Sequence, residues 1–599
     1  MTANGMTEQI VMTPKGKTAN STTLMIERKP VVIKEAANDK VHVGGGDHQG
    51  IVINKVITED IDNITVAQQS VQFRVFLVNA QTELRTQESR TLKFWFKPSC
   101  PAFEHPSAAQ NFFRDLVAPQ DFPRDYVGFI KKIMKLMQHN YPVIRKIEIE
   151  LKQLDQSSVP ARPLSTDETI LNKPAEISEK KVLEVIESAY PNPITIMDIV
   201  RSHGWLEESV AEYLSTLQTK GFVKAMEHDS FTRMVQDEKQ IQIVKQMPSI
   251  ASKKQPTIAI ITAQYCEKVA VDALIENKET FVRYTTVGVT PSLSANSLSS
   301  KSSLVKSTVT RFGESNVYTL GNIGTHRIVC TKLPSVGHTR EAMTAAGNTT
   351  TRLLGTFQKV DYVLLVGLGG GVPHYTDYNK HVRLGDVVVS HPTDDKRYVY
   401  TYCDNVRTDD NSHVEFECKE FCPPNLEIQN VAAKLKQQVE LNGISIPWLK
   451  YFDEGRKALS AEYPETDFAR PPPESDKLYM CVGERDIIEV AHPQPSDSNN
   501  NLEGVPRVHL GPVASGRAVS RHEQLRQLFA LQSAALAFDS EFDSVIDSVR
   551  GNCRDSFALV RGIADYRDGT KKSEWQSYAA LAAAAVVKAI ICAMDPPSD

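Results

Sequence analysis

The sequence predicts a multi-domain protein: an α+β N-terminal region, a small α+β unit, and a large α/β region at the C-terminal end. A chain of 599 residues is too long for one hydrophobic core and should form roughly three or four domains. From residue 256 onward, apolar strand patterns alternate with helical patterns, which is typical of α/β folds. A proline-containing stretch at 156–174 is expected to be a linker.

The composition is that of an ordinary soluble protein. The chain is 41% hydrophobic and 24% charged, with a net charge of −5, which argues against a chain-wide nucleic-acid or membrane-surface role. Its nine cysteines are scattered and form no CxxC pair. Cys418 and Cys422 are spaced as CxxxC, which is a poor zinc pattern. We therefore expect no metal, no cofactor and a reducing compartment, namely the cytoplasm with the nucleus as an alternative.

The sequence shows no targeting or membrane segment. The first residues contain no basic region followed by an apolar core, so no secretory signal is expected. The apolar run from Ala579 to Met594 is alanine-rich, contains Lys588 and is shorter than the roughly 20 residues that a bilayer helix needs. We expect a packed terminal helix there and no membrane contact.

The N-terminal region divides into a tail and an α+β domain. Residues 1–45 are polar and close on three glycines, so a disordered tail is expected. Residues 46–155 are expected to form an α+β domain, to which the sequence assigns no role. Its apolar residues alternate with period two over 51–97, and a helical pattern is expected over 106–153.

Residues 175–245 contain three short helical patterns followed by a hairpin. Ser178 is a candidate N-cap of the first helix, a second helix falls within 193–203, and Glu207 to Lys220 forms the third. The segments 222–225 and 231–234 can then pair as two strands. This arrangement resembles a winged helix, a variant of the helix-turn-helix.

The third helix of this unit carries more acidic than basic residues. Glu207, Glu208 and Glu212 stand against Lys220, whereas affinity for DNA depends on Lys and Arg that neutralise phosphates. We therefore favour a protein partner and keep DNA as the alternative.

Residues 256–599 are expected to form one α/β domain with helices covering its central sheet. Apolar strands are predicted at 258–263, 328–333, 362–366 and 386–389, with helical segments between some of them. A serine-rich insert at 290–310 is expected to be a mobile loop.

A lone carboxylate follows the last predicted strand of this domain. Leu559, Val560 and Ile563 predict a buried strand, and Asp565 stands where it gives way to a loop. In open α/β sheets, ligands bind outside the carboxyl ends of strands. Asp565 is therefore either a ligand-facing carboxylate or an ordinary turn or N-cap residue.

The stretch from Tyr362 to Pro373 predicts a buried strand that runs into a glycine-rich turn. Glycines at 367 and 369–371 let backbone N–H groups approach an anion or a sugar closely. No Gly-Lys-Ser/Thr follows, and the context of a dinucleotide site is missing. On its own this pattern is weak evidence for a binding site.

Together with four later motifs, the glycine stretch becomes specific. Arg383 to Ser390, Ala514-Ser515-Gly516, Phe538-Asp539-Ser540-Glu541 and Val560 to Asp565 follow in this order. The series resembles the nucleoside phosphorylase and methylthioadenosine nucleosidase superfamily, and most closely the phosphorylase-like domains that fungi fuse to NACHT and ankyrin modules. The resemblance covers about residues 256–595 and implies a mixed central sheet flanked by helices.

This resemblance implies cleavage of the N-glycosidic bond of a purine nucleoside or nucleotide. Asp565 matches the acid that protonates the departing base, a role that needs a protonated carboxyl group. Glu267 matches the glutamate that activates water, although it could be an exposed first-turn helix residue. Glu541 matches the glutamate that binds the ribose hydroxyls, although it could be a helix-start carboxylate. The remaining substrate-binding residues implied are Gly367, Gly369, Gly370, Ser515, Gly516, Val519, Phe538 and Ser540.

The resemblance favours hydrolysis over phosphorolysis. Where the phosphorylases place an arginine and a Ser or Thr on phosphate, this chain has Leu365 and Leu368, and arginine is the usual bidentate ligand of phosphate. A nucleoside phosphorylase with phosphate as co-substrate remains the alternative.

Two differences from the family pattern leave open whether the protein catalyses the reaction. Ser540 replaces the family's methionine beneath the sugar, and Val519 replaces an aromatic that stacks on the purine in the bacterial nucleosidases. A second alternative is therefore a non-catalytic, nucleoside-sensing regulatory protein. The resemblance also implies a homo-oligomer.

Overall fold

The computed structural model describes most of the chain. The described residues are 8–30, 41–44, 50–54, 66–78, 85–123, 125–154, 177–226, 229–234, 241–244, 247–248, 250, 254–284, 315–334, 340–408, 414–442, 445–482, 487–495, 504–520, 522–539, 542–566 and 573–597. The predicted linker 156–174 and the predicted insert 290–310 lie outside them.

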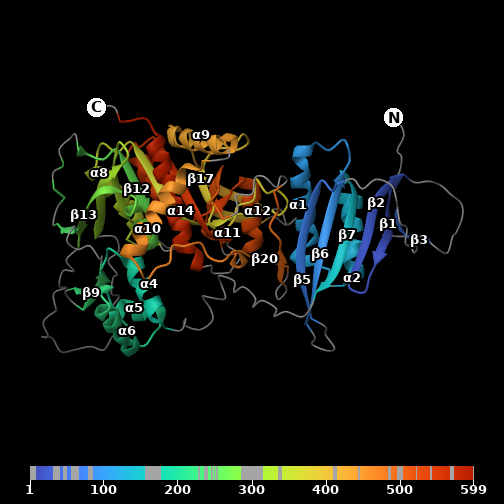
Figure 1. Ribbon diagram of the computed structural model, residues 1–599, viewed down its shortest axis with the longest axis horizontal. Coiled ribbons are helices and arrows are strands. Elements are labelled where there is room, and N and C mark those ends of the chain that lie inside the picture. The colour runs from blue at the N-terminus through green and yellow to red at the C-terminus, as the bar shows by residue number, and fades with distance from the viewer. Residues whose placement is uncertain are drawn as a thin grey trace, which may run out of the picture. The chain divides into compact units, whose positions relative to one another are not determined.

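The chain forms two compact units, which Figure 1 shows in the colours of the sequence. One unit contains residues 1–164, 373–381 and 472–501, and the other contains the rest. The predicted single domain 256–599 is therefore interrupted, because two of its segments belong to the N-terminal unit.

The N-terminal unit is built on a nine-stranded sheet in the order β20-β21-β5-β6-β7-β2-β1-β4-β3. Its helical segments are α1 (His105–Leu116), α2 (Tyr126–Lys135), a π-helical turn (Leu136–Asn140) and the short 3-10 turns Ala102–Glu104, Pro119–Asp121 and Pro473–Ser475. The strands are β1 (Glu8–Lys17), β2 (Ser21–Pro30), β3 (Val41–Val43), β4 (Ile51–Asn54), β5 (Gln69–Val78), β6 (Arg85–Phe96), β7 (Ile144–Leu154), β20 (Leu478–Cys481) and β21 (Ile487–Val490).

Two predictions for the N-terminal unit are wrong. Residues 8–30, expected in a disordered tail, form the antiparallel pair β1–β2. Their apolar residues are few, but Ile10, Leu24 and Ile26 are buried, which is enough to fix the register of a strand. Residues 144–154, expected to continue a helix, form β7, in which the buried residues recur with period two.

A hairpin from the C-terminal half completes the N-terminal sheet. β20 and β21 pair antiparallel, and β21 adds to the edge of β5 through Ile488 opposite Val75. Because β5 and β21 are more than 400 residues apart in the sequence, local patterns could not predict this pairing.

The second unit begins with the three helices and small sheet predicted for 175–245, and these predictions are confirmed. Ser178 caps the first helix by accepting a hydrogen bond from Lys181 N, and Gly204 ends the second helix in the left-handed conformation. The inward faces of the three helices share one apolar core. The elements are α4 (Glu179–Ala189), β8 (Ile194–Thr195), α5 (Ile196–His203), α6 (Glu207–Thr219), β9 (Val223–Met226) and β10 (Ser230–Arg233).

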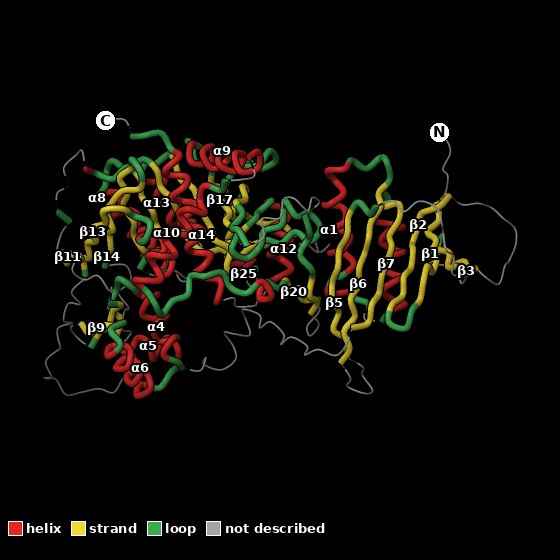
Figure 2. Tube along the Cα trace, viewed as in Figure 1, coloured by secondary structure: helices red, strands yellow, loops and turns green. Residues whose placement is uncertain are grey.

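The rest of this unit is a mixed α/β fold around a 13-stranded sheet, as Figure 2 shows by its yellow strands among red helices. At its centre β12 lies parallel to β15 and β16, and β16 lies parallel to β25. The strands are β11 (Ile241–Ile243), β12 (Ile258–Thr262), β13 (Glu276–Arg283), β14 (Asn316–Ile323), β15 (His326–Lys332), β16 (Tyr362–Gly371), β17 (Val387–Ser390), β18 (Tyr400–Thr408), β19 (Val414–Phe421), β22 (Val508–Gly511), β23 (Val513–Ser515), β24 (Ala537–Phe538) and β25 (Ser556–Asp565). The predicted mixed sheet flanked by helices is thus confirmed.

The last helix is the central helix of this fold. It packs against β25, β16 and α10, and it is the one described helix long and apolar enough to cross a membrane, with 78% of its most apolar window buried. It is therefore packed in the core, as predicted. The helices of this fold are α7 (Tyr265–Asp272), α8 (Arg340–Thr356), α9 (Glu427–Asn442), α10 (Pro447–Glu462), α11 (Arg517–Ser520), α12 (Glu523–Ser533), α13 (Asp543–Gly551) and α14 (Ser573–Ala593).

The contact between β25 and α14 depends on Gly562. A Cβ atom there would lie 2.0 Å from the backbone oxygen of Ala579, and a helix backbone cannot move away easily. We expect Gly562→Ala to destabilise the protein by about 3 kcal/mol or more, as severe overpacking does. Urea unfolding of Gly355→Ala gives the control, because a Cβ atom there meets nothing within 4 Å and alanine favours a helix by about 1 kcal/mol. Equal stability of the two variants would contradict this packing.

Candidate functional site

The glycine segment of β16 is part of the strand and not the turn that the sequence suggested. Gly370 pairs with Asp565 of β25 on one side and with Phe538 of β24 on the other. A Cβ atom at Gly367 would lie 2.7 Å from both Arg561 Nη1 and Glu267 Oε1, and one at Gly369 would lie 2.9 Å from the Phe538 backbone oxygen. The glycines are required because other groups lie directly against the strand.

Glu267 lies in the first turn of α7 with 2% of its surface exposed. Its Oε2 atom accepts hydrogen bonds from Ala263 N and Gln264 N, both at 2.8 Å, and its Oε1 atom accepts one from Leu368 N at 2.8 Å. The interpretation of Glu267 as an exposed first-turn residue is therefore wrong.

The protonation of Glu267 is set by opposing effects. Burial raises the pKa of this carboxyl group, and the three backbone N–H groups and the Arg561 guanidinium act in the opposite direction. The net direction is upward. A buried carboxylate with a raised pKa is a better proton acceptor than an exposed one.

Arg561 and Asp539 form a fully buried ion pair beside Glu267. Arg561 Nη2 donates to Asp539 Oδ2 at 3.1 Å, and Tyr400 donates its hydroxyl hydrogen to Asp539 Oδ1 at 3.2 Å. The guanidinium carbon lies 4.3 Å from the centre of the Phe542 ring. Arg561 Nε makes no hydrogen bond with any described residue. It is a buried donor that a water molecule or a ligand could use.

Sequence reasoning missed both members of this pair. An arginine between Val560 and Gly562 in an otherwise apolar strand was the available signal, because a charge is rarely buried without a partner.

The other predicted residues gather around Gly370. Asp565 is half-buried as the last residue of β25, and Ser515 Oγ donates to the Asp539 backbone oxygen at 3.3 Å. Gly516 has a φ of +146°, and a Cβ atom there would lie 2.6 Å from the Cys403 backbone oxygen. Val519 is fully buried in an apolar cluster with Phe529 and Phe538.

The structure describes nine of the eleven predicted site residues. All nine lie in one region that includes β16, β24, β25 and the start of α7. Ser540 and Glu541 lie outside the described residues.

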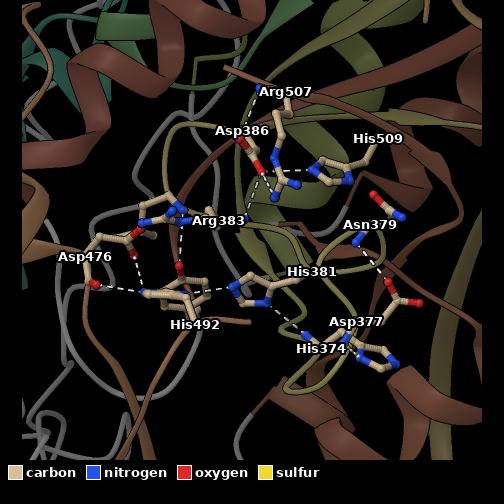
Figure 3. A network of polar contacts seen from close by, with 12 residues as sticks. His374, Asp377, Asn379, His381, Arg383, Asp386, Asp476, His492, Arg507 and His509 are labelled. Atoms are coloured by element: carbon tan, nitrogen blue, oxygen red, sulfur yellow. Dashed lines mark hydrogen bonds and ion pairs between the residues drawn. The ribbon is translucent and has the colours of Figure 1, made fainter. Parts of the chain in front are cut away.

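A second buried carboxylate supports the strand that ends at Asp565. Figure 3 shows Asp386 between Arg507 and His509: Oδ2 lies 3.1 Å from Arg507 Nη2 and 2.8 Å from His509 Nε2. Burial opposes ionisation of Asp386, but His509 and Arg507 outweigh it and lower its pKa. The next residue, Val387, pairs with Gly562 of β25. The cluster therefore anchors the neighbour of the Asp565 strand.

Figure 3 also shows a chain of histidines, which belongs to the N-terminal unit. His381 Nδ1 accepts from His374 N at 3.1 Å, and His381 Nε2 lies 2.8 Å from His492 Nδ1. His381 must then donate through Nε2, which fixes its neutral tautomer.

Among the residues that the structure describes, no group of three or more His, Cys, Asp or Glu side chains could hold a metal ion. Cys418 and Cys422 are exposed thiols.

Comparison with known proteins identifies the small helical unit. Residues 168–236 match the family model described as a winged helix-turn-helix domain. This unit is a winged helix-turn-helix domain. The winged helix predicted from its caps and hairpin is confirmed.

One relative is similar to about half of the chain. A nucleotide-binding leucine-rich repeat (NLR)-like protein of Hyaloscypha variabilis is 29% identical over 285 residues, which are 47% of this chain and 26% of that protein. The match thus spans about a quarter of the relative.

Solved structures of nucleosidases are similar to the chain, with low TM-scores and low sequence identity. The 5′-methylthioadenosine/S-adenosylhomocysteine nucleosidase of Neisseria meningitidis has a TM-score of 0.32 and 14% identity, covering 57% of this chain and all of that one. The futalosine hydrolase of Helicobacter pylori has a TM-score of 0.30 and 14% identity, covering 57% and 99%.

The buried pair of Arg561 and Asp539 leads to a stability prediction. Asp539→Ala leaves the Arg561 charge buried without its partner, and we expect a loss of about 3–5 kcal/mol. Asp404→Ala breaks the exposed pair with Lys419, whose side chains are 43% and 49% exposed, so we expect a loss of about 0–1 kcal/mol. Chemical denaturation of both variants measures the difference. A loss at Asp539 as small as that at Asp404 would contradict the buried pair.

Proposed function

We propose that the chain hydrolyses the N-glycosidic bond of a purine nucleoside or nucleotide. The observation that carries the proposal is the placement of Glu267 and Asp565 along the glycine segment of β16. Glu267 contacts the segment at Leu368 N, and Asp565 pairs with Gly370. The motif order from Gly367 to Asp565 supports the same conclusion.

The proposed reaction divides the work between the two carboxyl groups. Glu267 takes a proton from a water molecule whose oxygen attacks C1′ of the ribose. The electron pair of the C1′–N9 bond passes to the base, and Asp565 donates a proton to the base at N7. The products are the free purine and the ribose, which keeps any 5′ substituent of the substrate, and solvent returns the proton from Glu267 to Asp565. Arg561 Nε is suited to hold the attacking water, because it has no hydrogen bond to a described residue.

Water is favoured over phosphate by the charges in the site. Leu365 and Leu368 are buried and apolar, so neither can bind phosphate with a side chain. The Arg561 charge is neutralised by Asp539 at 3.1 Å. A phosphate dianion would therefore meet little uncompensated positive charge among the described residues.

The reaction is tested by release of free base. Purified protein is incubated with adenosine, methylthioadenosine, inosine, AMP and ATP, with and without phosphate, and free base is separated by chromatography. We expect phosphate-independent release, lowered about 100-fold or more by Asp565→Asn and by Glu267→Gln, since removal of a general acid or base costs this much. Asp555→Asn, an exposed residue preceding β25, is the matched control and should keep full activity.

Other outcomes would point elsewhere. Release that strictly requires phosphate would contradict hydrolysis and support the phosphorylase. If a nucleoside raises the melting temperature and no base is released, the non-catalytic sensing protein is favoured.

We propose in addition that the winged helix binds a protein partner and not DNA. Its α6 helix exposes Glu207, Glu208 and Glu212, and Lys220 is paired with Glu179 at 2.7 Å. An acidic surface repels the phosphates of DNA. Filter binding of the full chain to duplex DNA across a salt series should show no salt-dependent retention. Retention that weakens steeply with salt would contradict the proposal.

A further inference from the structure

Lys332, the last residue of β15, is fully buried and uses all three of its N–H donors. Its Nζ atom donates to the backbone oxygens of Ser188 at 2.9 Å, Tyr190 at 2.8 Å and Leu333 at 3.0 Å. Two of the three acceptors belong to the winged helix. A buried lysine of the α/β fold therefore has most of its hydrogen-bond acceptors in another domain.

These acceptors lie at the C-terminal end of α4. The last carbonyl groups of a helix have no partner within it, and they carry the negative end of the helix dipole. The Ile186 oxygen accepts from Tyr190 N, and the Ala189 oxygen accepts from Asn192 N. Lys332 binds two of the carbonyl groups that remain. It thus caps α4 from outside the winged helix, and α4 in turn stabilises a buried ammonium.

Lys332 also lies beside the backbone that holds Glu267. It is the pairing partner of Thr262 in the parallel ladder of β12 and β15. The two residues after Thr262, Ala263 and Gln264, donate the hydrogen bonds to Glu267 Oε2. Burial lowers the pKa of Lys332 to about 7. The charge of Glu267 is the largest effect that opposes this decrease.

The winged helix also contacts Tyr265, which lies in the backbone before Glu267. Arg233 of β10 pairs with Glu187 of α4 at 2.9 Å and with Glu465, which follows α10, at 3.2 Å. Its guanidinium carbon lies 5.3 Å from the centre of the Tyr265 ring, and the Tyr190 ring packs edge-on against that ring at 5.6 Å. Tyr265 begins α7, two residues before Glu267. Lys332 and Tyr265 thus connect the winged helix at two points to the backbone that precedes Glu267.

We propose that the docked winged helix is a structural part of the candidate site, and that Lys332 is a positioning residue which fixes the backbone around Glu267 only while the carbonyl groups at the end of α4 accept its hydrogen bonds. This inference rests on the proposed function where it concerns turnover. A partner that lifts α4 from Lys332 would leave the ammonium with one acceptor and loosen the segment 263–267. The winged helix would then be the point at which a partner controls hydrolysis.

Amide hydrogen exchange of the full chain tests the coupling without any substrate. Lys332→Met removes the cap, and we expect exchange at Ala263, Gln264 and Leu368 to become about tenfold faster or more, because their hydrogen bonds open more often. Lys588→Met is the matched control: Lys588 is also buried, and its partners among the described residues all lie outside the winged helix. They are the Leu274 backbone oxygen at 3.1 Å, the Glu276 and Glu454 carboxylates and the Tyr451 ring. The control variant should leave the exchange at these three amides unchanged.

Turnover gives the second reading. In Lys332→Met we expect kcat of base release to fall about tenfold or more with KM nearly unchanged, as loss of an orienting partner usually does, while Lys588→Met stays near the wild type. If Lys332→Met does not fold, Glu465→Gln removes one ion pair of Arg233 and should shift exchange in the same direction.

The outcomes separate the two proposals. Unchanged exchange at the three amides in both Lys332→Met and Glu465→Gln overturns the coupling, whatever the activity. Faster exchange in a protein whose wild type releases no base keeps the coupling and rejects the proposed hydrolysis.

Discussion

The candidate site depends on one interaction, the binding of the Glu267 carboxylate by three backbone N–H groups. Two of these groups follow β12 and the third belongs to β16, so the carboxylate joins two neighbouring strands where a ligand would lie. Burying a charge is costly unless it is hydrogen-bonded. Gly367 has no side chain and leaves room for both Glu267 and Arg561. The glycine strand and the buried charges therefore require each other.

The surrounding structure serves to hold these charges in place. Asp539 neutralises Arg561, and Tyr400 holds Asp539 from the other side. Asp386 with its histidine and arginine anchors β17 against the strand that ends at Asp565. Lys332 connects the winged helix to this arrangement, because the winged helix supplies two hydrogen-bond acceptors for a buried ammonium near Glu267.

The sequence predicted the features whose cause is local. The strands at 258, 328, 362 and 387, the Ser178 cap and the winged-helix hairpin follow from apolar period, capping and turn chemistry. Distant pairings were not predictable in this way. The Arg561–Asp539 pair, the Lys332 cap of α4 and the addition of β21 to β5 join segments 22, 142 and more than 400 residues apart. The strand β1 was missed because few of its residues are apolar.

The most direct test of the proposed hydrolysis follows the oxygen atom. The protein is incubated with a nucleoside that it cleaves in water labelled with oxygen-18, without phosphate, and the released sugar is analysed by mass spectrometry. Attack by water at C1′ predicts free purine and a ribose that carries one labelled oxygen at the earliest time points. This label must exceed the amount that free ribose takes up by exchange in the same labelled water, which a control incubation measures. Release of base only after phosphate is added, with ribose 1-phosphate as the sugar product, would contradict the account.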